Sequence, residues 1–284
     1  MQEELIGSQA WTFAENNNNA VRLQREGGDF SEPGQTCVEY FAHSCFRIRS
    51  PRGLTIVIDP WRNDPSGAWG SWFPKPFPEI SCDVVLSTHA HFDHDAVHRV
   101  HAAVTLERPV GVFTLGDVRI TGLGDKHMSA AKGSYVWTEV FAEGGVGLPP
   151  DNPMHLDNSI ITVETGGLKF AHWGDNRPTP AGHVMEALRG TDVLILPIES
   201  SDHILTCADV DALIAAIKPR VVVPCHYRLK GAVSVLSTLQ TADAFVNSHA
   251  PNERLASATW TLSPDDLPAD GTCIVHFGDH FQTK

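Results

Sequence analysis

The chain has little clustered positive charge. Its 284 residues include 21 Lys and Arg against 34 Asp and Glu, a formal net charge of −13, and no long run of Lys or Arg occurs. Nucleic-acid binding needs clustered cations to displace counterions from the phosphate backbone. We therefore expect no nucleic-acid partner. A small anionic substrate stays open, because bound metal ions supply local positive charge of their own.

Closely spaced cysteines and long apolar runs are also missing. The six cysteines show no Cys-x-x-Cys spacing, which argues against a zinc knuckle or a thioredoxin-type pair. A disulfide framework is not expected in a chain of this length. No stretch approaches ~18 uninterrupted apolar residues, so no membrane span is predicted. The start, Met1-Gln2-Glu3-Glu4, lacks the basic and apolar regions of a leader peptide. The expected location is cytoplasmic, and a leader trimmed beforehand stays an alternative.

Two regions differ in texture. Residues 1–34 read as a polar extension with an asparagine run at 16–19 and little apolar periodicity. Residues 35–284 read as one catalytic domain, and an apolar content of 42% supports a substantial core.

Within the domain, short β-branched and apolar runs predict strands, and capping signals predict helices. Strands are expected at 37–41, 45–49, 54–58, 83–88, 110–114, 118–123, 159–164, 168–173, 193–198, 221–224, 259–263 and 273–277. Helices are expected at 95–103, from 179–180 onward, at 206–217 behind a Thr206-x-x-Asp209 capping box, and at 232–248. This order indicates two β/α halves packed sheet to sheet.

A segment rich in proline and aromatic residues runs from 60 to 78. Its proline density excludes regular structure. Such a long loop is either a lid over a pocket or an excursion packed on the core, and the sequence leaves both readings open.

The densest chemical signal is Thr88-His-Ala-His-Phe-Asp-His-Asp95, directly after the predicted strand 83–88. His89 and His91 are two residues apart, so on extended backbone both imidazoles project to the same side and could grip one divalent cation. Asp93 and His94 follow where the chain turns, and they point elsewhere, towards a second cation. We conclude that the chain is a metalloprotein and expect a hydrolase.

Three further polar side chains follow predicted strands: His127, Asp175 and His226. Functional sites assemble on such strand ends, because the strands hold the loops rigid. His155 is an alternative to His127 as the third histidine of the first cation.

The ordered motifs resemble the metallo-β-lactamase superfamily. The resemblance rests on His89-x-His91-x-Asp93-His94, a lone His, Gly174-Asp175 and Pro224-x-His226 in that order. The finer stretches 43–46, 58–60, 196–198 and 224–227 are similar to the branch that contains ascorbate-6-phosphate lactonase and N-acyl-phosphatidylethanolamine phospholipase D. The resemblance covers residues 35–284 and implies an α/β fold of four layers, an αββα sandwich.

The resemblance also implies a ligand set. His89, His91 and His127 would bind one metal, Asp93, His94 and His226 a second, and Asp175 would bridge the two. Mixed nitrogen and oxygen ligands suit Zn²⁺, and also Mn²⁺, Fe²⁺ or Ni²⁺. Zinc is the first choice, although no cysteine stands at these positions to favour it.

The expected reaction is hydrolysis of a small ester, lactone, phosphodiester or amide by a metal-bridging hydroxide, with Asp93 and Asp175 as catalytic residues. Its substrate is a small molecule, and the oligomeric state stays open. A mononuclear iron dioxygenase of the persulfide type on the same fold is the alternative, followed by a metal-stabilised binding protein without catalysis. The candidate substrate-binding residues are His43, Trp69, Trp72, His203 and Tyr227.

Overall fold

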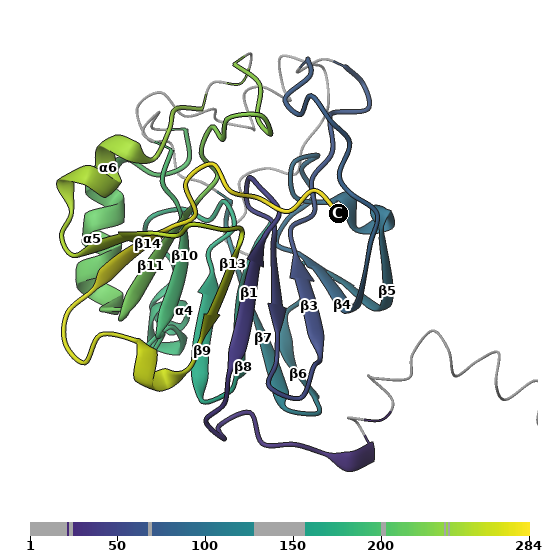
Figure 1. Ribbon diagram of the computed structural model, residues 1–284, viewed down its shortest axis with the longest axis vertical. Coiled ribbons are helices and arrows are strands. Elements are labelled where there is room, and N and C mark those ends of the chain that lie inside the picture. Colours follow the sequence, from purple (N-terminus) through teal and green to yellow (C-terminus); the bar gives the residue numbers. More distant parts are fainter. Residues whose placement is uncertain are drawn as a thin grey trace, which may run out of the picture.

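The computed structural model describes residues 22, 25–67, 70–127, 157–199, 203–235, 237 and 239–284. These residues form two β-sheets that face each other (Figure 1). The first sheet has the order β13-β1-β2-β3-β4-β5, with bounds Thr259–Leu262, Thr36–Tyr40, Phe46–Arg49, Thr55–Ile58, Ile80–Ser87 and Val100–Glu107. The second has the order β12-β14-β11-β10-β9-β8-β7-β6, with bounds Asn252–Arg254, Cys273–His276, Val221–Cys225, Val193–Pro197, Leu168–His172, Asn158–Thr165, Val118–Asp125 and Gly111–Leu115.

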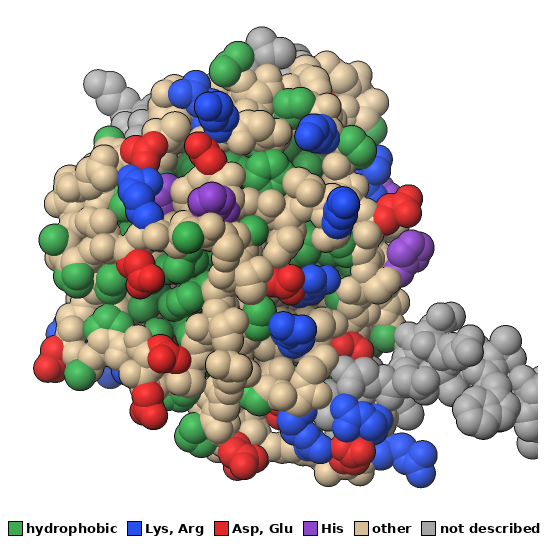
Figure 2. Space-filling view, in the orientation of Figure 1, with side chains coloured by type: hydrophobic (Ala, Val, Ile, Leu, Met, Phe, Trp, Pro, Cys, Tyr) green, Lys and Arg blue, Asp and Glu red, His purple; other side chains and the backbone are tan. Residues whose placement is uncertain are grey.

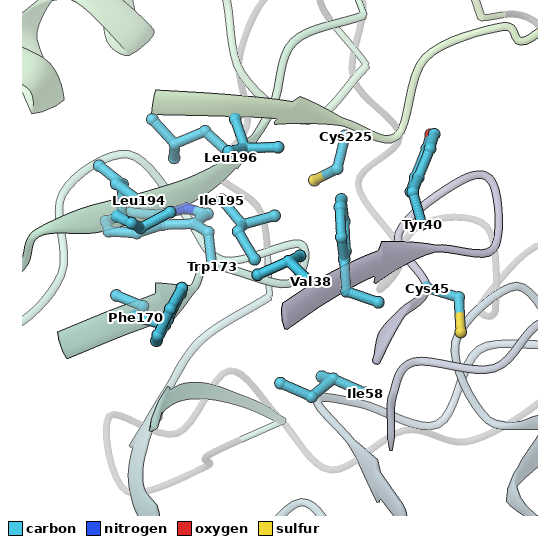
Figure 3. Close-up of a cluster of buried hydrophobic side chains, with 14 of the residues drawn as sticks. Val38, Tyr40, Cys45, Ile58, Phe170, Trp173, Leu194, Ile195, Leu196 and Cys225 are labelled. Atoms are coloured by element: carbon cyan, nitrogen blue, oxygen red, sulfur yellow. The ribbon is translucent and has the colours of Figure 1, made fainter. Parts of the chain in front are cut away.

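The core lies between the two sheets. β10 and β11 are buried at every position, as their continuous apolar sequences predict for central strands. Figure 3 shows side chains of β9 and β10 on one side and of β1 and β3 on the other, meeting in one apolar layer. Such sheet-on-sheet packing fixes the loops at the strand ends.

Between residues 35 and 284, the described part of the chain contains three α-helices: α4 (Gly182–Ala187), α5 (Cys207–Ile217) and α6 (Asp243–Ser248). Figure 1 shows them beside the strands of the second sheet. Two short 3-10 turns, η1 (Ala96–Arg99) and η2 (Pro264–Asp266), complete the elements. The two-sheet α/β sandwich confirms the predicted fold class. No helix among the residues described is both long and apolar enough to cross a membrane.

All twelve predicted strands are present, β5 and β12 were not predicted, and two predicted helices are wrong. The helix expected at 95–103 is only η1, after which β5 begins at Val100 and pairs in parallel with β4. The helix expected at 232–248 is present only as α6, from Asp243. Before it, backbone groups bond to distant segments instead: Ser234 N donates to Trp72 O, and Arg228 N donates to Gln240 O.

The other two helices were predicted with different accuracy. α5 begins behind Thr206, whose side chain and that of Asp209 form the expected capping box. α4 begins at Gly182 rather than at 179–180, and its N-cap, Ala181, makes no side-chain capping bond.

The aromatic loop is packed on the core in its described part. Trp61, Phe73 and Phe77 are 1–3% exposed, and the rings of Trp61 and Phe73 stack with centroids 4.2 Å apart. This arrangement favours the core-packed reading over a lid. Most of the polar extension 1–34 lies outside the described residues. Its last residues contact the domain, where Gly34 N donates to Gly166 O.

Candidate metal centre

The candidate ligands come from one end of the sandwich, where several strands deliver their carboxyl ends. His89 follows β4, His127 follows β7, Asp175 follows β9 and His226 follows β11. β9, β10 and β11 are parallel, and β7 runs in the same direction because it is antiparallel to β8, which is antiparallel to β9. The topology therefore brings together side chains that are far apart in the sequence.

The first cluster, called the rim group below, consists of His89, His91 and His127. One ring nitrogen from each lies within 4.8 Å of the others. His89 is buried, His127 is 8% exposed and His91 is half-buried. Three imidazoles converging from β4 and β7 are a suitable set for one divalent cation. The structure thus places His127 in this group, whereas His155 lies outside the described residues.

The second cluster, called the deep group, consists of Asp93, His94 and His226, joined by His43. One ligand atom from each of these four buried residues lies within 4.8 Å of the others. His43 Nε2 lies 3.0 Å from Asp93 Oδ2. Because a carboxylate only accepts, we assign the proton of this hydrogen bond to Nε2 of His43.

Asp175 lies between the two groups. Its Oδ1 is 3.3 Å from His94 Nε2, and its Oδ2 is 3.3 Å from His226 Nε2 in the deep group. The same Oδ2 is 3.6 Å from His127 Nε2 and 3.8 Å from His89 Nε2 in the rim group. One buried carboxylate therefore faces both groups.

The donor atoms of this centre fit a cation. Nε2 of His89, His94 and His226 and Oδ1 of Asp175 are buried and make no hydrogen bond within the described residues. A buried polar atom without a partner costs about 1–3 kcal/mol. Several such atoms aimed at a common region are expected of metal ligands, since a bound ion would satisfy them together.

The electrostatics of the deep group also favour positive charge. Burial opposes the charged form of His94, but Asp175, Asp59 and Asp93 outweigh it and raise the pKa of His94 to about 9. Burial likewise opposes ionisation of Asp175, yet His226 and His94 hold the pKa of Asp175 well below its ordinary value. The carboxylates thus stay ionised and attract a cation.

The rim group shows the opposite shift. Burial lowers the pKa of His91 to about 3, with His127 as the next cause. Burial and the neighbouring His94 lower the pKa of His89 well below its ordinary value. Neutral imidazoles present lone pairs, which is the state that binds metal.

Asp59, which directly follows β3, orients candidate ligands of both groups, and the sequence analysis does not predict it as a site residue. Its Oδ2 lies 2.7 Å from His94 Nδ1 and accepts from Thr88 Oγ1 at 2.8 Å. Thr88 Oγ1 in turn lies 3.0 Å from His89 Nδ1. Such carboxylate–imidazole pairs fix the ring and leave Nε2 for the metal. The signal in the sequence was a carboxylate before a proline at a strand end.

Glu199 is a second buried carboxylate beside a candidate ligand, His226, at a longer distance. This carboxylate follows β10, is fully buried, and its Oε1 lies 3.6 Å from His226 Nδ1. The same oxygen accepts from Ile204 N at 3.0 Å. Nothing in the local sequence separates this glutamate from a surface residue.

Three centre residues hold strained backbone. His43, Asp59 and His226 have φ of 56°, 55° and 58°, in the left-handed region that favours glycine. Strain of this kind concentrates at functional sites, because the surrounding structure must impose it.

The predicted substrate-binding residues are placed differently from one another. His203 stacks on His226 with centroids 6.1 Å apart, and Trp72 meets His43 edge-on at 6.4 Å. Tyr227 donates its hydroxyl to Gly278 O at 2.9 Å and packs against Tyr40, on the core side. This placement favours a packing role for Tyr227. Trp69 lies outside the described residues.

Comparison with known proteins identifies the family. Residues 37–226 match the family profile described as a beta-lactamase superfamily domain. The chain belongs to the metallo-β-lactamase superfamily. It is a metal-dependent hydrolase of that superfamily, which confirms the resemblance drawn from the motifs.

Named relatives agree with this assignment. A UPF0173 metal-dependent hydrolase of Methanosphaera stadtmanae is 30% identical over 217 residues, covering 67% of this chain and 83% of the relative. Another of Myxococcus xanthus is 25% identical over 207 residues, covering 68% of this chain and 71% of the relative. A crystal structure of a metallo-beta-lactamase superfamily protein from Thermotoga maritima has a TM-score of 0.60 at 22% identity. That match covers 87% of this chain and all of the other.

Proposed function

We propose that this superfamily member hydrolyses its substrate with two divalent cations held by seven side chains. His89, His91 and His127 would hold the rim ion, Asp93, His94 and His226 the deep ion, and Asp175 both. The observation that carries the proposal is the position of Asp175, whose carboxylate lies 3.3 Å from deep-group and 3.6–3.8 Å from rim-group ring nitrogens.

The bound ions would supply a shared water whose pKa is lowered from ~16 towards ~7, and thus a nucleophile at neutral pH. The chain supplies orientation and proton transfer. Asp93 is ionised and accepts from His43 at 3.0 Å, so this oxygen is fixed while the carboxylate stays available to take and pass a proton. Burial, with His226 nearby, lowers the pKa of His43 to about 4, so the ring is neutral at pH 7.

Zinc is the metal we favour, with Mn²⁺, Fe²⁺ and Ni²⁺ as alternatives, because the donor set is nitrogen and oxygen throughout. We propose a small ester, lactone, phosphodiester or amide as the substrate. Trp72 and Phe92, whose rings meet edge-on 5.4 Å apart, and His203 border the deep group. These rings favour a partly apolar substrate, in a lactonase-like reaction.

The test is elemental analysis of the purified protein, followed by a hydrolysis panel of esters, lactones, phosphodiesters and amides after metal reconstitution. The expected result is two ions per chain and turnover of at least one class. One iron per chain with oxygen consumption would instead indicate a dioxygenase. Two bound ions without turnover of any class would indicate a binding protein.

Asp93→Asn is the sharpest variant for the mechanism. We expect it to lower kcat by about 100-fold or more while the fold is retained, because it removes the proton acceptor but preserves side-chain shape. Unchanged turnover, with unfolding temperature as the control, would refute the role of Asp93.

A further inference from the structure

Two short segments that carry metal-centre residues run side by side next to the rim group. One is 125–127, which ends at His127, and the other is 175–177, which begins at Asp175. His127 and Asn176 form an isolated antiparallel bridge, and Arg177 N donates to Lys126 O at 3.0 Å. The backbone thus holds His127, which follows β7, next to Asp175, which follows β9.

A bidentate ion pair lies across the same two segments. Arg177 Nη2 donates to Asp125 Oδ1 at 2.6 Å, and Arg177 Nε donates to Asp125 Oδ2 at 3.3 Å. Asn176 Nδ2 donates to the same Oδ2 at 2.9 Å. The Asp125 side chain is 3% exposed and that of Arg177 28%. Because the planar guanidinium makes two hydrogen bonds to one carboxylate, it fixes the relative orientation of the two segments as well as their distance.

Further hydrogen bonds tie this pair to the sheet. Asn158 Nδ2 donates to Asn176 Oδ1 at 3.1 Å, and Trp173 Nε1 donates to Asn176 O at 2.8 Å. On the other side, Asp157 N donates to Asp125 O at 3.1 Å, and His127 N donates to Asp157 Oδ1 at 2.6 Å. The pair therefore links β7, β8 and the turn after β9.

We propose that the Asp125–Arg177 pair is a positioning device for the rim ion, acting through His127. It fixes the His127 ring relative to Asp175 and so sets the affinity of the rim group. The inference rests on the proposed two-ion function. The histidines of the deep group lie outside these two segments, and His94 Nδ1 is held by Asp59 Oδ2 at 2.7 Å, so the deep ion should depend on this pair far less than the rim ion.

Arg177→Lys tests the device, because it keeps the charge but removes the fork. The full chain is freed of metal and titrated with Co²⁺, and visible absorption reports the coordination of each ion. His127→Ala serves as the reference for loss of the rim ion, and His226→Ala as the reference for loss of the deep ion. We expect rim affinity to fall about 10- to 100-fold and deep affinity to stay within about 2-fold. Asp125→Asn, which keeps the shape of the side chain, should give the same pattern.

The matched control is Arg119→Lys on the same strand, β7. Arg119 faces Glu164 at 3.8 Å, with both side chains partly exposed. This control should leave both affinities unchanged. Unfolding temperatures of the metal-free variants show whether a loss of affinity merely reflects a loss of stability.

A double-mutant cycle separates positioning from a general structural role. If the pair acts through His127, Arg177→Lys should weaken Co²⁺ binding no further in a His127→Ala background. Equal weakening in both backgrounds, equal loss at both groups, or unchanged rim affinity would overturn the inference. If the wild-type chain binds only one Co²⁺, the two-ion function is refuted. The double-mutant cycle of Arg177→Lys and His127→Ala, measured on that single ion, would still decide whether the Asp125–Arg177 pair acts through His127.

Discussion

The rim and deep groups differ in how they are built. The deep group is buried and lies among the carboxylates of Asp59, Asp93, Asp175 and Glu199. Despite burial, these carboxylates raise the pKa of His94 and His226, whereas burial lowers the pKa of His43. The rim group consists of imidazoles only and includes the half-buried His91, and burial lowers the pKa of His89 and His91. The two groups therefore differ in the negative charge around them, and we expect the deep group to bind its ion more tightly than the rim group.

The largest effect should come from removing what the two groups share. Asp175→Asn is expected to lower kcat/KM by roughly three orders of magnitude and to reduce metal content towards one ion or none, because its carboxylate faces both groups. Metal analysis and hydrolysis assays on the same preparation check this. Retention of two ions with near-normal turnover would remove Asp175 from the centre.

Asp59→Asn should sharpen the contrast between the groups. The loss of charge beside His94 Nδ1 is expected to weaken the deep ion about 10- to 100-fold. The rim ion should weaken less, since Asp59 reaches His89 only through Thr88. Metal titration of the variant measures both constants, and a larger loss at the rim would reverse the comparison.

Chelation should separate the groups by order of release. Limiting chelator is expected to remove the rim ion first. Each ion removed should lower Tm by roughly 5–10 °C, since an ion present at about 100 times its Kd stabilises the native state by about 2.7 kcal/mol. Calorimetry at stepwise chelator concentrations follows both stages. Simultaneous loss of both ions in one step would contradict the ordering.

The smallest effect is expected at Tyr227, which directly follows His226 of the deep group. Tyr227→Phe removes only the hydrogen bond to Gly278 O and should cost about 1 kcal/mol of stability with KM unchanged. Denaturant unfolding and steady-state kinetics measure the two quantities. A raised KM with unchanged stability would restore Tyr227 as a substrate-binding residue.

The strands, the fold class and the candidate ligands were accessible from sequence because each has a local signature. β10 and β11 are apolar throughout, and α5 carries both halves of its capping box. The apolar spacing of residues 232–242 fits a helix, whereas Ser234 N donates to Trp72 O in the aromatic loop and Gln240 N donates to Glu199 O.

The residues that orient the ligands were not accessible in the same way. Asp59 and Glu199 act on histidines 35 and 27 positions away in the chain, and Arg177 acts on Asp125, 52 positions before it. Such roles arise only when strands from both halves deliver their ends to one place. The sequence shows the candidate donors of a metal centre, whereas the contacts that orient them arise only in the tertiary structure.

The left-handed backbone at His43, Asp59 and His226 sets the stability of the fold against the chemistry of the site. Glycine at any of these three positions would relieve local torsional strain on the order of 1 kcal/mol, yet it would delete a side chain of the centre. Selection for thermal stability alone would thus favour glycine variants at these positions, which we expect to have lost activity. Any engineering of a hardier enzyme from this chain has to keep those three positions fixed and seek its gains elsewhere.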